Sequence, residues 1–222
     1  RDAELDIVVT GAGRAFCPGA DLAHRAGPDD HSLPNGDIAR TTPLDIRKPM
    51  IAAINGACAG VGLAYALQCD LRFAVDGAKF TTAFARRGLI AEYGMAWLLD
   101  SIAGRQTALD LLLSARVVLA EEAAELGVIT QAVPADDLMA TVMAYAADLV
   151  ANASPASMAT IKHQVNTEPS MSADDALMNA EGLMRESLAG ADVVEGIDSF
   201  LEKRQVGFAP LGDGTRFGWM FD

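Results

Sequence analysis

The sequence predicts an α/β protein in which glycine-punctuated strands come first and helices come second. Short apolar runs that end in glycine lie in the first half, whereas apolar residues at three- and four-residue spacing dominate from Met95 onward. The 222 residues are 51% hydrophobic and 21% charged, which is typical of a folded domain and not of a disordered chain. We therefore expect a globular protein with one sizeable core.

Four segments of the first half have the composition of strands. Leu5–Val9 and Met50–Ile54 are rich in apolar, β-branched residues and run into Gly11 and Gly56, as strands buried on both faces do. Leu71–Val75 and Ala78–Thr82 flank an Asp-Gly pair, a signal of a hairpin. These segments are expected to build the sheet part of the core.

Helices are predicted between and after these strands. The stretch from Gly60 to Gln68 is small and apolar, so we expect a buried helix. Gly127 closes another helix, and Val128–Val133 then predicts a short strand stopped by Pro134. A later helix begins at Ser172. The apolar faces of the amphipathic helices are Leu138, Val142, Tyr145 and Leu149, and then Leu177, Met184 and Leu188.

The pattern divides the chain into three parts. Residues 1–134 are expected to form the core, residues 135–205 a helical region and residues 206–222 a C-terminal tail. The sequence does not begin with methionine, so we expect that strands of the core can precede it. No internal repeat or low-complexity linker is visible.

Charge and cysteine content limit the partners and the compartment. The formal net charge of −13 opposes binding to nucleic acid or to an anionic membrane. No apolar run approaches the roughly 20 residues of a membrane span. Cys17, Cys58 and Cys69 follow no metal-ligand spacing, which favours buried thiols in the cytoplasm over a disulfide pair with one spare thiol. We expect no metal ion and no separate cofactor.

Two glycine-rich stretches carry the functional argument. In Val8–Leu22 a strand runs into Gly11, Gly13 and Gly19, and glycine lets the backbone turn sharply and approach a ligand. In Lys48–Ala74 a strand, an Asn-Gly turn and a helix start follow in order. Free N–H groups at a helix start can stabilise a developing oxyanion. Neither stretch is a dinucleotide fingerprint or a P-loop.

Together the two stretches resemble the enoyl-CoA hydratase/isomerase, or crotonase, family, and the resemblance runs from about Leu5 to Arg204. It implies a spiral of ββα turns followed by a helical trimerisation region, and acyl-CoA thioesters as substrates. It also implies that the amides of Ala20 and Val61 hold the thioester oxygen. A homotrimer or a dimer of trimers follows from the same resemblance.

The resemblance further assigns residues that contact the substrate. Residues of the "GADLA" segment are implied to line the path of coenzyme A, and the helix start contributes Gly60 beside Val61. Lys203 is similar to a C-terminal lysine of the family that approaches the CoA nucleotide, although a solvated helix end explains it equally well. The complete set implied for substrate binding is Ala20, Asp21, Leu22, Ala23, Gly60, Val61 and Lys203.

The chain departs from the hydratases of the family at both catalytic glutamates. Hydratases of the family carry one glutamate four residues after the first of three consecutive glycines, and that position is Ala64 here; the second glutamate position is Phe84. Neither side chain can move a proton. A hydration mechanism that needs two glutamates is therefore not expected.

Glu92 is the candidate catalytic residue. It lies in an otherwise apolar run from Gly88 to Leu99, where burial of an unpaired carboxylate is costly. "AEYG" resembles the segment in which isomerases of the family carry one glutamate that moves a proton between carbons two and four of a 3-enoyl-CoA. Desolvation would raise the basicity of such a carboxylate. The alternative is structural: Glu92 caps a helix that starts near Tyr93, or it pairs with Arg86 or Arg87.

Several other residues have structural explanations. Asp21 suits a turn or a helix cap better than proton transfer, and Trp97 is expected in the core. His24, His31 and His163 show no metal-ligand spacing. The sequence thus favours a 3-enoyl-CoA isomerase. A hydratase or thioester hydrolase that activates water with Glu92, and a non-catalytic acyl-CoA-binding homologue, remain as alternatives.

Overall fold

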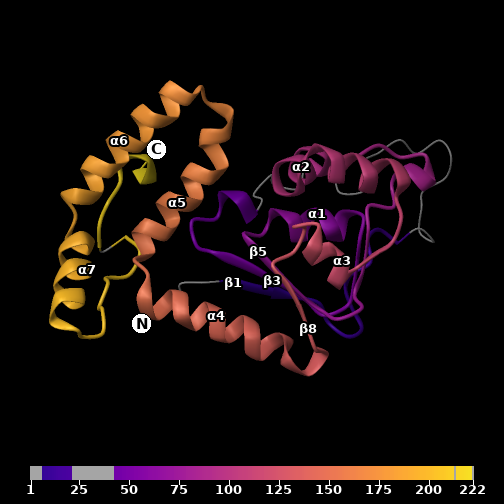
Figure 1. Ribbon diagram of the computed structural model, residues 1–222, viewed down its shortest axis with the longest axis horizontal. Helices are drawn as coiled ribbons and strands as arrows, with labels where there is room; N and C mark the ends of the chain where they lie inside the picture. Colours follow the sequence, from indigo (N-terminus) through magenta and orange to yellow (C-terminus); the bar gives the residue numbers. More distant parts are fainter. Residues whose placement is uncertain (1–6, 22–42, 213, 222) are drawn as a thin grey trace. The chain divides into compact units, whose positions relative to one another are not determined.

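A computed structural model describes residues 7–21, 43–212 and 214–221 (Figure 1). The described residues divide into two units, each considered by itself. The strand unit comprises residues 9–21, 43–45 and 51–139. The helical unit comprises residues 7–8, 46–50, 140–212 and 214–221.

The strands form two four-stranded sheets, and the chain alternates between them except at its last two strands, which come in the reverse order. One sheet has the order β1 (Ile7–Thr10), β3 (Met50–Ile54), β5 (Leu71–Val75) and β8 (Gln131–Val133), which lie side by side in Figure 1. The other has the order β2 (Ala15–Cys17), β4 (Ala57–Ala59), β6 (Lys79–Thr81) and β7 (Val118–Leu119). Each turn of the chain thus adds one strand to each sheet. This alternation is the predicted spiral, and the α/β fold class is confirmed.

Strand β3 is the buried centre of the first sheet. All five of its residues are buried, and it pairs in parallel with β5 over Ile51 to Ile54. Strand β5 then pairs in parallel with β8. A parallel strand covered on both faces needs apolar residues at every position, which explains the unbroken "MIAAI" run.

A buried arginine on β5 was not anticipated from the sequence. The guanidinium of Arg72 donates to the carbonyl oxygens of Val128 (2.8 Å) and Cys69 (2.6 Å), and burial lowers its pKa. Backbone carbonyls near the ends of β5 therefore receive charge-assisted hydrogen bonds. Arg72 is a structural residue that ties the strand to the segments around it.

The predicted hairpin around Asp76 and Gly77 is wrong. Strands β5 and β6 belong to different sheets, and Gly77 turns the chain with a φ of +70°. The N–H of Asp76 donates to Val133 on β8 (2.8 Å), and the N–H of Gly77 donates to the carboxylate of Glu121 (2.9 Å). The Asp-Gly pair thus makes a corner between sheets.

The helices of the strand unit follow the prediction closely. Helix α1 (Val61–Gln68) is the buried helix expected after β3 and β4. Helix α2 (Met95–Ser114) is interrupted at Gly104, and α3 (Ala120–Glu125) ends before Gly127, whose φ is +73°. Short 3-10 helices cover Pro43–Asp45, Ala85–Arg87 and Ala135–Asp137.

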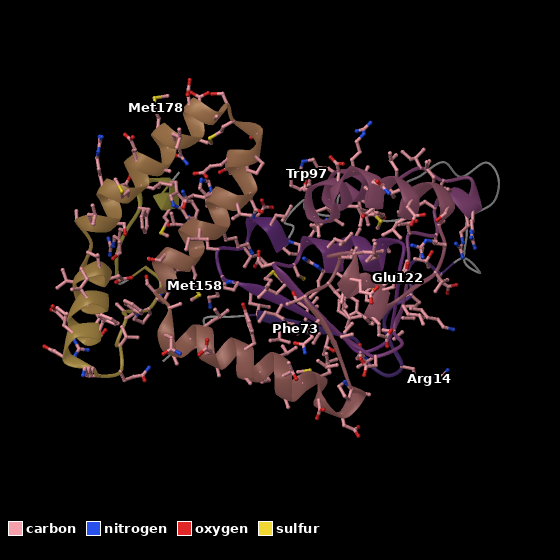
Figure 2. All side chains as sticks on the ribbon, viewed as in Figure 1. Arg14, Phe73, Trp97, Glu122, Met158 and Met178 are labelled. Atoms are coloured by element: carbon pink, nitrogen blue, oxygen red, sulfur yellow. The ribbon has the colours of Figure 1, made fainter. Side chains whose placement is uncertain are left out.

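The exposure of Trp97 and the state of the three cysteines can be compared with the predictions. Trp97 on α2 is 54% exposed, so its expected place in the core is wrong (Figure 2). The three cysteines carry thiols, not disulfides; Cys58 and Cys69 are buried and Cys17 is half-buried. Burial raises the pKa of the Cys58 thiol, and the neighbouring Cys17 and Cys69 add to this shift.

Four helices build the second part of the chain. They are α4 (Leu138–Asn152), α5 (Pro155–Thr167), α6 (Ala173–Leu188) and α7 (Ala191–Glu202). Ser172 caps α6 by accepting from the N–H of Asp175 (3.2 Å), as predicted. Two 3-10 helices, Glu168–Ser170 and Gly218–Phe221, complete this part.

The predicted apolar face of α4 is covered in part. Leu138 and Val142 are buried, Leu149 is half-buried, and Tyr145 is exposed. The buried side of α4 is completed by Ala146.

A buried polar cluster links α5, α7 and the C-terminal tail. The Ser154 hydroxyl donates to the carboxylate of Asp192, and the N–H of Asp192 donates to Thr215 (3.0 Å). The N–H of Thr215 returns a bond to Asp192 (3.3 Å). Such satisfied buried groups fix the packing of the segments that supply them.

Apolar faces of α6 and α7 are exposed. Leu183 is the buried residue of α6, whereas the predicted face of Leu177, Met184 and Leu188 is open to solvent. Met178 of α6 is also exposed (Figure 2), as are Val194, Ile197, Phe200 and Leu201 of α7. Among residues 7–21, 43–212 and 214–221, no helix combines the length and the hydropathy needed to cross a membrane.

Candidate active site

The loop after β2 carries Ala20, the first predicted oxyanion donor, and it approaches the segment before α1. Gly19 has a φ of +99°, which favours glycine, and a Cβ there would lie only 3.1 Å from the Ala59 carbonyl oxygen. The segments that carry Ala20 and Val61 therefore touch one residue before Ala20 and two residues before Val61.

The start of α1 is held in place by a second set of contacts. Gly60, with a φ of +51°, donates its N–H to Thr81 on β6 (3.1 Å) and accepts the first helical bond from Ala64 (3.1 Å). A Cβ at Gly62 would lie 2.2 Å from the Cys17 carbonyl oxygen. This close approach of α1 to β2 is possible only for glycine.

Both predicted oxyanion donors lack a partner in the described residues. Val61 is the first residue of α1, where the N–H has no acceptor within the helix. Among residues 7–21, 43–212 and 214–221, no hydrogen bond uses the N–H of Ala20 or of Val61. Within the described residues neither N–H is engaged, and the shared hole remains a prediction.

Glu92 lies two residues before the N-cap of α2. The N-cap of this helix is Gly94, and no side chain caps it, so the expectation that Glu92 could be the cap is wrong. Arg86 donates instead to the Ser114 carbonyl (2.8 Å), and Arg87 to the Ala83 carbonyl (3.0 Å). Within the described part of the chain, the half-buried Glu92 carboxylate forms no hydrogen bond or ion pair.

The run around Glu92 is more exposed than the sequence suggested. Leu89 and Ile90 precede it, and Ile90 is 80% exposed. Met95, Leu98 and Leu99 are buried. The expectation of a continuously buried apolar run is therefore wrong for the residues before α2, and the apolar side chains beside Glu92 form a surface instead.

An unusual backbone holds Glu92 near α1. Tyr93 has a φ of +54°, and left-handed non-glycine residues are uncommon and concentrate at functional sites. The Tyr93 ring lies 6.4 Å from the ring of Tyr65, which is one turn after Val61 in α1. Glu92 is thus the neighbour of Tyr93, whose ring packs near α1, the helix that begins with Val61. The sequence did not signal this pair of tyrosines.

The two glutamate positions of the hydratases are buried and apolar. Ala64 is fully buried in α1, and Phe84 is buried at the start of the 3-10 helix Ala85–Arg87. A carboxylate at either position would have to be accommodated inside the core. The structure therefore offers no second proton-transfer group at these two positions.

The structure describes the remaining predicted residues only in part. Leu22, Ala23, His24 and His31 lie outside the described residues, and Asp21 is exposed. Lys203 is exposed at the end of α7, in the helical unit. His163 stacks on Trp219 with ring centroids 4.2 Å apart, which is a structural role.

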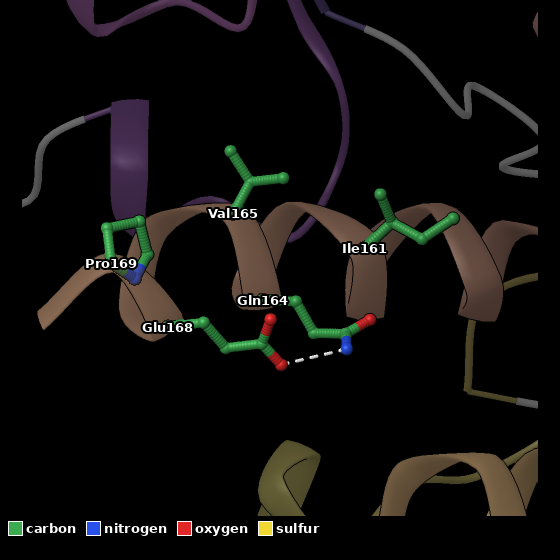
Figure 3. Close-up of a pocket in the computed structure, with 5 residues that line it drawn as sticks. All are labelled: Ile161, Gln164, Val165, Glu168 and Pro169. Carbon is green, nitrogen blue, oxygen red and sulfur yellow. Dashed lines mark hydrogen bonds between the residues drawn. The ribbon is translucent and has the colours of Figure 1, made fainter. Parts of the chain in front are cut away.

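A pocket of about 450 Å³ lies elsewhere, in the helical unit (Figure 3). Gln164 donates to Glu168 (2.9 Å), and Asn179 of α6 donates to the same carboxylate oxygen (3.0 Å). None of the predicted site residues lines this pocket, whose walls are Ile161, Gln164, Val165, Glu168 and Pro169. Among the described side chains, no group of three potential ligands could hold a metal ion.

Comparison with known proteins agrees with this reading of the fold. A sequence model of the enoyl-CoA hydratase/isomerase family matches residues 2–210. The chain is 36% identical over 212 residues to a 1,2-epoxyphenylacetyl-CoA isomerase of Escherichia coli, a match covering 91% of this chain and 80% of that protein. It is also 36% identical over 206 residues to a probable enoyl-CoA hydratase of Rhodobacter capsulatus, covering 89% and 78% of the two chains.

A solved structure gives the same result. The crystal structure of a probable enoyl-CoA hydratase/isomerase from Mycobacterium abscessus superposes with a TM-score of 0.85 at 27% identity, covering 92% of this chain and 81% of that one. The chain belongs to the enoyl-CoA hydratase/isomerase family.

Proposed function

We propose that this chain isomerises 3-enoyl-CoA to 2-enoyl-CoA with a single glutamate. Glu92 removes a proton from carbon two of the substrate, and the resulting enolate places negative charge on the thioester oxygen. The amides of Ala20 and Val61 stabilise that oxygen. Glu92 then returns the proton to carbon four, so the double bond moves and no atom is gained or lost.

The main support for one-glutamate chemistry is the state of three positions. Glu92 is half-buried and has no partner among the described residues. Its neighbour Tyr93 contacts Tyr65 of α1. Ala64 and Phe84 are buried and cannot exchange protons. Isomerisation needs one group that is a base and then an acid, whereas hydration by a glutamate pair needs two.

The oxyanion hole has independent support from backbone geometry. The contacts of Gly19 with Ala59, and of Gly62 with Cys17, hold the two loops together. The N–H groups of Ala20 and Val61 have no acceptor in the described residues. We propose that Asp21 and Gly60 line the substrate beside these donors.

The relatives leave the reaction open between two outcomes. One relative is named an isomerase of an epoxide-bearing CoA thioester, and another is named a probable hydratase. A hydratase or hydrolase that uses Glu92 alone to activate water is therefore the second candidate. Incubation with 3-enoyl-CoA, 2-enoyl-CoA and a saturated acyl-CoA distinguishes the candidates, since each yields a different product. Binding without any turnover would overturn the enzymatic proposal.

Glu92→Gln tests the residue itself. The change keeps the volume but removes the base, so turnover should fall by about 10²–10⁴ while acyl-CoA binding changes little. The free energy of unfolding should change by less than about 0.5 kcal/mol, because Glu92 caps no helix and joins no ion pair in the described residues. Isomerisation rate and melting temperature are measured on one preparation.

The control is Asp100→Asn, which removes an exposed carboxylate from α2, eight residues after Glu92, and should keep full activity. An active but destabilised Glu92→Gln variant would show that the carboxylate is structural.

We also propose a homotrimer or a dimer of trimers. The exposed apolar residues of α6 and α7 support this assembly, because a soluble monomer rarely leaves contiguous apolar faces uncovered. Closed symmetry would cover equivalent faces on every chain.

A further inference from the structure

We propose that Asn55 is a positioning residue, which keeps the two oxyanion loops in register with each other. Asn55 touches neither the reacting atoms nor Glu92; it acts through the strands that lead to Ala20 and Val61. The inference rests on the oxyanion hole of the proposed function. The sequence alone indicated only that Asn55 belongs to the turn that ends a strand.

The side chain of Asn55 makes three hydrogen bonds to one turn. Its Oδ1 accepts from the N–H of Gly11 (3.1 Å), and its Nδ2 donates to the carbonyl oxygens of Gly11 (3.0 Å) and Gly13 (2.9 Å). The amide therefore engages the β1–β2 connection with both of its polar atoms, while its own backbone joins β3 to β4. Only a side chain with a donor and an acceptor at this reach can make the full set.

Strands β2 and β4, which follow these two turns, are short and irregularly paired. Ala15 is opposite Ala57 and Cys17 is opposite Cys58, so β2 advances two residues while β4 advances one. Phe16 is the extra residue of a bulge. A three-residue pairing with a bulge has little of its own to prevent a slip, so its register must be fixed from outside.

Glycine contacts transmit the register along this pair. At the Asn55 end, a Cβ on Gly56 would lie 2.2 Å from the Arg14 carbonyl oxygen. At the other end, Gly62 and Gly19 make the close contacts with Cys17 and Ala59 described above. Backbone touches backbone at both ends, so a displacement of one strand is passed on to the loops.

A small displacement is enough to affect the chemistry. One residue of slip moves a strand by about 3.3 Å, and oxyanion donors act only when they lie about 2.7–3.1 Å from the developing charge. Releasing the Asn55 clamp should therefore weaken stabilisation of the enolate more than binding of the substrate.

The test is Asn55→Ala, which deletes all three bonds. We expect kcat for 3-enoyl-CoA isomerisation to fall about 10- to 100-fold with KM nearly unchanged. A second readout is the infrared carbonyl band of a bound saturated acyl-CoA with ¹³C at the thioester carbonyl. Wild-type protein should shift this band to lower frequency, and Asn55→Ala should lose most of the shift.

Thr10→Val is the matched control. It removes one hydrogen bond between neighbouring strands, from the Thr10 hydroxyl to the Ala53 carbonyl (2.8 Å), without touching the glycine turn. Its kcat and carbonyl band should be those of wild type even if its melting temperature falls. Should Asn55→Ala fail to fold, Asn55→Asp keeps the acceptor for Gly11 but deletes both donors and turns a carboxylate oxygen toward the Gly11 and Gly13 carbonyls, so it should show at least the same loss.

The outcomes separate the two hypotheses. A wild-type band shift that the Asn55 variants keep in full would overturn the positioning role and leave the oxyanion hole intact. No band shift in wild-type protein would overturn the oxyanion hole and the inference built on it. A band shift without turnover would overturn the isomerase assignment alone, and the Asn55 comparison would still be read from the spectrum.

Discussion

The strand unit and the helical unit differ in how far their helices and strands bury apolar side chains. In the strand unit, β3 is buried along its whole length and six of the eight residues of α1 are buried. In the helical unit, α6 buries Leu183 and leaves most of its other large apolar residues open, and Phe200 of α7 is 81% exposed. Each unit has buried apolar residues of its own, and α6 and α7 in addition present apolar residues that a further surface could cover.

One glycine from each unit shows how differently the space around a helix is filled. Gly62 of α1 stands where any side chain would collide with the Cys17 backbone, whereas a Cβ on Gly182 of α6 would meet nothing within 4 Å. In the strand unit this close approach lies beside Val61, which we propose as an oxyanion donor. Gly182 does not represent every glycine of its unit, because a Cβ on Gly190 would lie 2.4 Å from the Thr215 side chain.

The glycine comparison yields the largest expected effect. Gly62→Ala should lower the free energy of unfolding by about 3 kcal/mol, because the collision is with backbone atoms that cannot move aside. Activity should fall with it, since α1 carries Val61. Gly182→Ala should instead stabilise the protein by about 0.5–1 kcal/mol, because alanine is the better helix former. Urea unfolding of both variants measures these changes.

If both substitutions lowered the free energy of unfolding equally, the contrast between Gly62 and Gly182 would be wrong. Destabilisation by Gly182→Ala would mean that this position of α6 faces another chain in the proposed assembly.

Assembly gives the second effect. Ile197 on α7 is exposed in the single chain, and burial of such a side chain contributes about 1.5–3 kcal/mol. Ile197→Glu places a charge there and should weaken association at least about tenfold. Light scattering should show wild-type protein at the mass of three or six chains and the variant with smaller species. Asp198→Ser, one residue further along α7, is the control and should keep the wild-type mass; a monomeric wild-type protein would contradict the proposed assembly.

The sequence predicted the units unequally, and the reason is physical. Met50–Ile54 and Leu71–Val75 were predicted to the residue, because buried parallel strands are continuous apolar runs with glycine at their ends. The hairpin at Gly77 was wrong because an Asp-Gly pair fixes a turn and not the sheet in which the next strand pairs. Trp97 was misplaced because the spacing of residues on α2 does not say which side of the helix is covered.

The site was predicted only as far as local motifs reach. Gly19 and Gly60 signalled close approach of two backbones, and the structure brings their segments together. The contact of Tyr65 with Tyr93, and the three bonds of Asn55, join residues that are far apart along the chain. No pattern within one segment encodes such a contact, because it depends on how the turns of the spiral stack.

The smallest expected effect concerns an ion pair of the helical unit. Arg204 binds Glu195 of α7 through two bonds (2.6 and 2.8 Å), and the N–H of Gly207 adds a third (2.7 Å). The hydrogen bonds from Arg204 are the main cause, and that from Gly207 the next, of a lowering of the pKa of Glu195 from 4.5 to about 2. The contribution of this carboxylate to stability is therefore complete above pH 4.5 and is lost as the pH falls through 2. Both side chains are accessible to solvent, so the effect at pH 7 should be slight and should shrink in salt. Melting temperatures of wild type and Glu195→Gln, followed by circular dichroism between pH 7 and pH 2, should differ by a small amount that disappears in acid. A difference that grows as the pH falls would mean that other carboxylates, and not this pair, hold α7 against the segment that follows it.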